Sequence, residues 1–100
     1  MKQPPLRFLD FESTDDGLGW VTLEAMVEVS PARKDEVLAE WARVWSWAHE
    51  NAQGPQGPLD EGGEWDGCVS ENLSDDGWWT AVFTLTGSEA FVAAFDAAFV

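Results

Sequence analysis

The sequence contains no tyrosine, one cysteine, one histidine and only five lysine and arginine residues among its 100 positions. A single cysteine, Cys68, forms no disulfide within the chain, which fits a reducing compartment. His49 and Cys68 are too few for a zinc site, and a lone histidine has no nucleophile motif to join. The sequence therefore predicts no metal, no cofactor and no catalytic residue, and it favours a non-enzymatic protein over an enzyme.

Positive charge is scarce, since 19 aspartate and glutamate residues give a formal net charge of −14. Such a charge opposes direct binding to nucleic-acid phosphates or to anionic lipid. No apolar run approaches the roughly 20 residues of a membrane span, and the N-terminal residues lack the apolar core of a signal peptide. We expect a cytoplasmic protein whose partner is a basic protein, with no direct binding to nucleic acid or membrane.

Aromatic residues are plentiful, with seven tryptophans and six phenylalanines. They can fill one hydrophobic core, and the length suits one cooperative unit. We expect a single domain that spans residues 1–100.

Two stretches of the chain resemble each other: "ESTDDGLGWVTLEAMVEV" at Glu12–Val29 and "ENLSDDGWWTAVFTLT" at Glu71–Thr86. In each, Asp-Asp-Gly suits a chain reversal, and the following residues alternate between apolar and polar as in a strand. Each copy is therefore interpreted as a hairpin turn with the strand that leaves it. The four expected strands are Leu6–Glu12, Trp20–Val29, the segment "EWDGCVSE" at Glu64–Glu71, and Trp78–Thr86.

A helix is expected after each copy. The first begins at Ser30 and Pro31 and runs to about Asn51, and a capping box of Thr86 and Glu89 opens the second. The apolar stripe of the first helix contains Val37, Leu38, Trp41, Val44, Trp45 and Ala48, with Glu40 and Trp47 off the stripe; that of the second contains Phe91, Phe95, Ala98 and Phe99. Gln53–Gly63 is rich in glycine and proline and is expected to be a surface loop.

The order strand, strand, helix, repeated, predicts an α+β, ferredoxin-like fold: a four-stranded antiparallel sheet with two helices on one face. Relative to the usual order the fold is permuted to ββαββα, because the N-terminal strand fills the place of a missing C-terminal strand. The helices would leave the other sheet face open. That open face is expected to carry Trp20, Met26, Trp78 and Val82 among threonines, which is more apolar than a solvated face needs.

The candidate binding residues are acids in turns and loops together with two tryptophans. Exposed tryptophan is a typical interface anchor, although Trp47 could instead pack beneath the Gly-Pro loop. Neither acidic turn has the ligand spacing of a calcium loop. The candidates are Asp15, Asp16, Asp60, Glu61, Glu64, Asp66, Asp75, Asp76, Trp47 and Trp78.

Three segments of the chain resemble parts of two known families. "GGEWDGC" at Gly62–Cys68 resembles a segment of the regulator-of-ribonuclease-E-activity B family, over a match of roughly Trp20–Glu71, although Cys68 replaces a usual tryptophan and the Gly-Pro loop is an insertion. This resemblance implies an acidic ferredoxin-like protein that inhibits a nuclease by binding it. "VEVSPARKDEVLAEW" and "TLTGSEAFVAAF" resemble dimeric ferredoxin-like monooxygenase barrels, whose final strand is missing here.

Three functions stay open at this point. The first is an acidic module that binds the basic surface of a nuclease, a restriction or CRISPR component or a toxin, with carboxylates that imitate phosphates. The second is a homodimer, paired through the open sheet faces, that encloses a small-molecule or monooxygenase-like site lined by Trp20, Met26, Trp78 and Val82. The third is a structural accessory domain. Acidity that serves solubility alone is the alternative to the first function, and monomer and homodimer are both compatible with the sequence.

Overall fold

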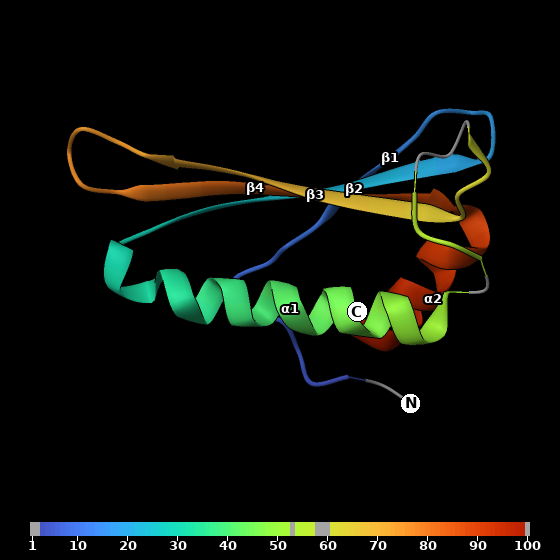
Figure 1. Cartoon of the computed structure of the whole chain (residues 1–100), viewed down its shortest axis with the longest axis horizontal. Coiled ribbons are helices and arrows are strands. Elements are labelled where there is room, and N and C mark those ends of the chain that lie inside the picture. The colour runs from blue at the N-terminus through green and yellow to red at the C-terminus, as the bar shows by residue number, and fades with distance from the viewer. Residues whose placement is uncertain (1–2, 53, 58–60, 100) are drawn as a thin grey trace.

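The computed structural model of the chain describes residues 3–52, 54–57 and 61–99. A sheet forms one layer and two helices form the other (Figure 1). The elements are β1 (Glu12–Asp15), β2 (Trp20–Val29), the short 3-10 helix η1 (Pro31–Arg33), α1 (Lys34–Asn51), β3 (Trp65–Leu73), β4 (Trp79–Ser88) and α2 (Glu89–Phe99).

The sheet has four antiparallel strands in the order β1-β2-β4-β3. This order, with the sequence ββαββα, confirms the permuted ferredoxin-like arrangement, because β1 lies beside β2 where a C-terminal strand would usually lie. The two long central strands pair from Trp20 opposite Ser88 to Val29 opposite Trp79. Both helices lie on the same side of the sheet (Figure 1).

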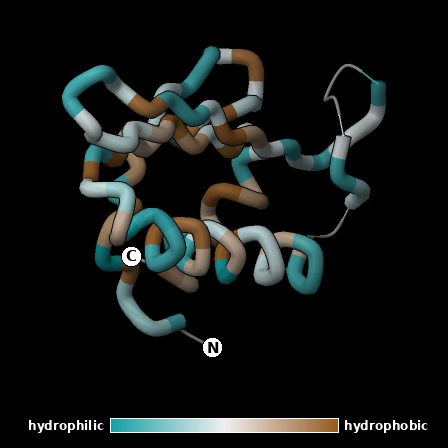
Figure 2. The backbone as a smooth tube through the Cα atoms, turned by 60° about the vertical axis from the view of Figure 1, so that its left-hand side comes forward, coloured by the Kyte–Doolittle hydropathy of each residue, from teal (hydrophilic) through white to brown (hydrophobic). Residues whose placement is uncertain are grey.

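Strict alternation along β2 and β4 builds the sheet side of the core. Every second residue of each strand is buried toward the helices, as the sequence predicts, and Phe83 and Leu85 are fully enclosed. Figure 2 shows hydrophobic residues, in brown, in both the sheet and the helix layer. Successive side chains of a strand point to opposite faces, so the remaining residues of β2 and β4 point to the helix-free face.

The predicted first strand, Leu6–Glu12, is wrong. The strand β1 is only four residues long and begins at Glu12, whereas residues 6–11 run without regular structure from the sheet to the helix layer (Figure 1). Leu9 is buried in the core, and Phe11 packs edge-on against Phe95 at a ring distance of 5.4 Å. The apolar residues of this segment therefore cover the core instead of pairing in the sheet.

Glu40 explains how that segment is held. The sequence places Glu40 off the apolar stripe of α1, yet it is only 6% exposed. Its carboxylate accepts hydrogen bonds from the backbone N–H groups of Arg7, Phe8 and Leu9 at 2.7, 2.8 and 2.8 Å. A buried charge is tolerated when it is hydrogen-bonded, and here three consecutive amides supply the bonds. The prediction that places Glu40 away from the buried side of α1 is therefore wrong, because a charged side chain is normally assigned to the surface.

The start of α2 also differs from the prediction. Thr86 is still part of β4, which continues to Ser88, so the Thr86 and Glu89 capping box does not form. Ser88 takes the capping position, because its Oγ accepts a hydrogen bond from the Phe91 N–H at 3.1 Å. The apolar stripe of α2 is confirmed: Phe91, Phe95, Ala98 and Phe99 are all buried.

Candidate binding surface

The helix-free face of the sheet gathers acids and threonines. The register places Glu12 of β1 directly opposite Glu24 of β2, and Thr14 opposite Thr22, which in turn faces Thr86 of β4. We call this surface the acidic face. Its outward residues are Glu12, Thr14, Trp20, Thr22, Glu24, Met26, Glu28, Asp66, Cys68, Ser70, Asn72, Thr80, Val82, Thr84 and Thr86.

The carboxylates of the acidic face have no cationic partner among the described residues. The ion pairs found among the described residues join Arg33 to Glu36 at 3.9 Å and Lys34 to Glu71 at 3.5 Å, and both involve the helix layer. Like charges directly opposite each other on neighbouring strands destabilise a sheet. The opposed Glu12 and Glu24 therefore carry a cost in stability that no described cation offsets.

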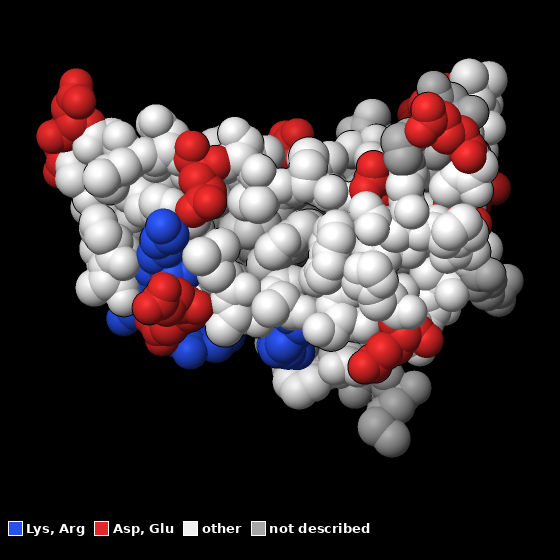
Figure 3. Space-filling model, in the orientation of Figure 1, with Lys and Arg blue, Asp and Glu red and all other residues white. Residues whose placement is uncertain are grey.

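Basic side chains lie on the other side of the molecule. No lysine or arginine occurs in any of the four strands, and Arg33, Lys34 and Arg43 belong to η1 and α1. Arg43 donates to the Pro4 carbonyl at 2.6 Å, which ties it to the N-terminal segment. In Figure 3 the basic side chains lie in the lower, helix-bearing half, whereas acids lie in both upper corners and also in the lower half. The described basic side chains are therefore absent from the sheet, whereas acids occur on both sides of the molecule, since Asp35, Glu36 and Glu50 belong to α1.

The two Asp-Asp-Gly copies form turns of similar design, as the sequence predicts. Asp16 Oδ1 accepts from the N–H groups of Leu18 and Trp20 at 2.7 and 3.1 Å, and Asp76 Oδ1 accepts from the Trp78 N–H at 3.3 Å. The glycine that follows has a positive φ, 77° at Gly17 and 90° at Gly77, a conformation that favours glycine. The second aspartate and the glycine thus explain the repeated tripeptide through turn geometry.

The carboxyl group of Asp76 is further bonded by the Ser74 hydroxyl. That hydrogen bond, followed by the one from the Trp78 N–H, holds the pKa of Asp76 below its ordinary value. Both bonds favour the charged form of the carboxylate. Asp76 therefore stays ionised at neutral pH.

The two acidic turns lie at opposite ends of the sheet. The β1–β2 turn precedes Trp20, which pairs with Ser88, whereas the β3–β4 turn precedes Trp79, which pairs with Val29. The ten residues of β2 separate the two turns by about 30 Å. One compact partner surface therefore does not reach both turns without crossing the acidic face.

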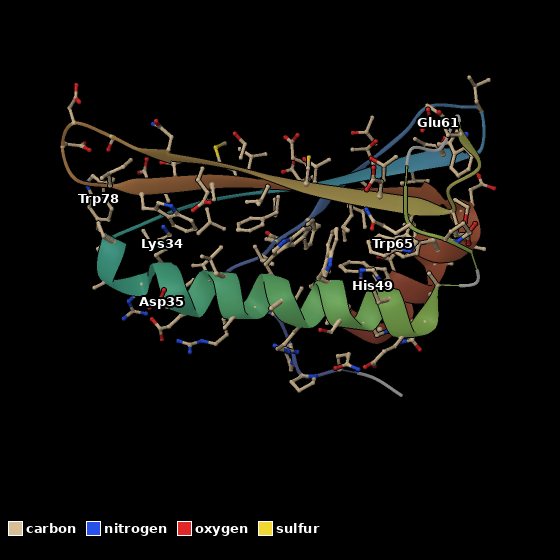
Figure 4. The ribbon with its side chains drawn as sticks, in the orientation of Figure 1. Lys34, Asp35, His49, Glu61, Trp65 and Trp78 are labelled. Atoms are coloured by element: carbon tan, nitrogen blue, oxygen red, sulfur yellow. The ribbon has the colours of Figure 1, made fainter. Side chains whose placement is uncertain are left out.

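The remaining acidic candidates that the structure describes, Glu61, Glu64 and Asp66, lie near the end of the sheet that carries Asp15 and Asp16. Asp60 is outside the described residues. Glu61 lies at that end of the sheet in Figure 4, and the Glu64 carbonyl accepts from the Ser88 N–H at 3.1 Å. Asp66 is the second residue of β3 and lies on the acidic face, where its Oδ1 accepts from the Gln56 side chain at 2.7 Å. Of these acids Asp66 belongs to the acidic face, whereas Glu64 lines a depression beside Trp47, Asn51 and Phe91 of the helix layer.

The two candidate tryptophans have different environments. Trp47 is 6% exposed and packs against Phe91, Phe95 and Phe99 of α2, at ring distances of 5.5–5.9 Å. Its assignment as an exposed anchor is wrong, because α2 lies against the side of α1 that carries Trp47. Trp78 is 45% exposed at the β3–β4 turn, immediately before β4 (Figure 4). Trp78 is the candidate that solvent reaches.

The described part of the acidic face has no depression of ligand size, whereas depressions of about 670, 470 and 330 Å³ lie along the N-terminal segment and the helices. A depression of about 120 Å³ over Asp66, Cys68, Thr84 and Thr86 is smaller than typical ligand pockets of roughly 300–1,000 Å³. Within residues 3–52, 54–57 and 61–99, no three His, Cys, Asp or Glu side chains are grouped as metal ligands. The helices in this part of the chain are too short or too polar to cross a membrane.

Sequence reasoning missed three acids of the acidic face, Glu12, Glu24 and Glu28. Glu24 and Glu28 occupy the polar positions of β2, so alternation alone could have assigned them to the helix-free face. The pairing of Glu12 with Glu24 had no signal, because β1 begins where the predicted strand ends. Comparison of the chain with protein-family models, curated proteins and solved structures finds no match.

Proposed function

We propose that the chain is a non-enzymatic, cytoplasmic binding protein whose acidic face docks on the basic surface of a protein partner. The observation that carries the proposal is a group of acids without compensating charge: Glu12, Glu24, Glu28 and Asp66 share a face on which no strand supplies a lysine or arginine. A surface of one sign accelerates encounter with a surface of the opposite sign.

The nature of the partner follows from that charge. Basic grooves that bind nucleic acid are lined by lysine and arginine, so a nuclease, a restriction or CRISPR component or a toxin is the class that an acidic face fits. In this mode carboxylates take the place of phosphates. The threonine hydroxyls between the acids can bond to the same groove, because hydroxyls both donate and accept hydrogen bonds. The likeness of Gly62–Cys68 to nuclease-inhibitor segments points to the same class.

The test compares two reversals of equal charge on opposite faces. The double variant Glu24→Lys and Glu28→Lys changes the acidic face, and the control Glu36→Lys and Glu50→Lys changes exposed positions of α1. A partner is first isolated from the source organism on the immobilised chain at low salt. Its association rate is then measured with both variants at low and physiological salt.

We expect the acidic-face reversal to slow association by tenfold or more and the control to have a much smaller effect. Raised salt should slow association with the wild type, because it screens exposed charges. The chain should also compete with nucleic acid for the isolated partner. Equal effects of the two reversals would mean that net charge, and not the acidic face, drives binding, and would contradict the proposal.

A further inference from the structure

The outer edge of β3 has backbone groups that point away from the sheet. At its two ends the Glu64 carbonyl and the Ser74 N–H bond toward β4, whereas the Trp65 carbonyl accepts on the opposite side from the Gly57 N–H at 2.9 Å. Because these directions alternate along a strand, the N–H and C=O groups of Gly67, Val69, Glu71 and Leu73 face outward. The loop at Gln56 and Gly57 thus pairs with the first residue of this edge.

The rest of this edge is open in the described part of the chain. Gly67 donates its N–H to the Asp66 carboxylate at 2.9 Å, but no bond reaches the outward groups of Val69, Glu71 or Leu73 from a described residue. Natural proteins usually protect such edges with short strands, bulges, prolines or lysines. The register of β3 is unbroken over nine residues, with neither proline nor lysine, and Val69 and Leu73 are 39% and 64% exposed.

A partly exposed stripe of α1 runs beneath this edge. Lys34 pairs with Glu71, and Trp45 and His49 each pack edge-on against Trp65, with ring distances of 5.1 and 5.2 Å. Figure 4 shows Lys34 near the start of α1 and His49 near its end, with Trp65 above His49. Between these two ends, helical spacing places Leu38, Trp41 and Trp45, all only half-buried, on the same stripe.

We propose that the edge of β3 binds an extended segment of the basic partner as a fifth strand of the sheet. Addition of a strand to an exposed edge is a recognised way of binding peptides, with main-chain hydrogen bonds for affinity and alternate side chains for specificity. One set of side chains would cover Leu38, Trp41 and Trp45. The other set, lysine or arginine, would extend beside Asp66 along the acidic face. The sign of the partner's charge in this inference rests on the proposed function.

Charge argues against a second copy of the chain as the occupant. Two β3 strands placed side by side would bring Asp66 and Glu71 of both copies to one seam, between molecules that each carry a net charge of −14. Like-charge contact opposes association. A segment that alternates apolar and basic residues satisfies both sides of the edge at once.

The probe is a nine-residue peptide of alternating lysine and valine, and the control peptide has the same composition with its lysines and valines in two blocks. Nuclear magnetic resonance follows exchange of the backbone amides in the full chain. We expect the alternating peptide to slow exchange at Val69, Glu71 and Leu73. The amides of Cys68 and Ser70 should change little, because they already face β4.

A matched pair of variants tests the same edge through affinity. Val69→Pro removes an outward N–H that β4 does not use, and proline is tolerated at such edge positions, whereas Val69→Thr keeps the N–H. The proline variant should bind the alternating peptide roughly tenfold or more weakly, and the threonine variant about as well as the wild type. Amide exchange in the wild type provides the result if the proline variant fails to fold.

Three outcomes would overturn the inference: equal binding of the two peptides, protection spread over the acidic face without the β3 amides, or wild-type dimers that Val69→Pro abolishes. The last would make a second copy the occupant. The Glu24→Lys and Glu28→Lys variant separates this inference from the proposed function. If that variant keeps partner association but Val69→Pro loses peptide pairing, the docking face is wrong and the edge inference stands. The converse result would leave the docking face and remove the edge.

Discussion

A single buried carboxylate connects the N-terminal segment to the first helix. Glu40 accepts hydrogen bonds from the amides of Arg7, Phe8 and Leu9, so its removal would leave one buried and two partly buried donors without a partner. Unsatisfied buried donors cost about 1–3 kcal/mol each, although part of this cost can be relieved by water. The segment is therefore more tightly bound to the protein than its irregular backbone suggests.

We expect Glu40→Ala to lower the free energy of unfolding by about 2–4 kcal/mol, measured by urea denaturation. The control is Glu36→Ala on the exposed side of the same helix, where the ion pair with Arg33 spans 3.9 Å. That change should stay within about 0.5 kcal/mol. Equal losses of unfolding free energy in the two variants would contradict the prediction. They would mean that replacing a glutamate destabilises α1 itself, without a contribution from the bonds to the N-terminal segment.

Replacement of Trp47 by alanine should destabilise the protein more than replacement of Trp41. This is the opposite of the order that the apolar stripe of α1 predicts, because Trp47 lies off that stripe. Trp47 is enclosed by phenylalanines of α2, whereas Trp41 is half-buried between Phe83 and Trp45. Truncation of a large core residue costs about 3–5 kcal/mol, and we expect Trp47→Ala to fall in that range. Thermal unfolding should show a clearly smaller loss for Trp41→Ala. A larger loss for Trp41→Ala would contradict this ranking.

At the scale of elements, the β3–β4 hairpin contains a titratable turn. The Ser74 hydroxyl is the largest cause of the lowered pKa of Asp76, so Ser74→Ala should raise that pKa toward its ordinary value. A side-chain titration by nuclear magnetic resonance measures the change. Ser70→Ala, on the acidic face of β3, is the control and should leave the titration of Asp76 where it is.

The sign of the pH effect follows from the direction of the shift. A lowered pKa in the folded state means that Asp76 stabilises the hairpin at pH values above the pKa of an unfolded aspartate. This contribution is lost as the pH falls through the lower, folded pKa. For the same reason, replacement of Asp75 and Asp76 by lysine removes turn hydrogen bonds as well as charge. A reversal at this turn therefore affects both binding and the hairpin.

The elements that sequence patterns predicted are those whose own residues bury one face. Alternation in β2 and β4 and the phenylalanine stripe of α2 are local signals, and the structure confirms them. The strand predicted for the N-terminal segment was wrong because the segment bonds to Glu40, thirty-odd residues away, and a charged residue is normally assigned to solvent. The prediction of an exposed Trp47 was wrong because the side of α1 that is buried depends on where α2 lies. Contacts between residues far apart in the sequence therefore determine both features.

The candidate surface was only partly predictable for the same reason. The sequence indicated acidity and the position of the turns, but the register across β1 and β2 determines that Glu12 and Glu24 face each other. The strand order then decides that the two turns lie at opposite ends of the sheet. Neither the register nor the strand order can be predicted from the residues of a single segment.

At the scale of the whole molecule, negative charge opposes compactness. Self-repulsion at a net charge of −14 destabilises the folded state, and salt screens it. Between 0.01 M and 0.15 M ionic strength the screening length falls from about 30 Å to about 8 Å. We expect the melting temperature to rise by a few degrees over this interval, measured by circular dichroism.

The acidic-face variant provides the comparison for that measurement. Glu24→Lys and Glu28→Lys reduce the negative charge where it is least compensated, so the rise in melting temperature with salt should be smaller than in the wild type. A melting temperature that falls with salt would show that attractive ion pairs outweigh the repulsion.

The displaced first strand also makes the fold topologically convertible. The Gln3 N–H bonds to the Ala98 carbonyl at 2.7 Å, so the two ends of the described chain lie side by side in the helix layer. A short linker between them, together with a new opening in the β1–β2 turn, would circularly permute the protein. The strand β1 would then come last in the chain. The permuted protein would keep the same contacts between elements, and its elements would follow one another in the usual ferredoxin-like order.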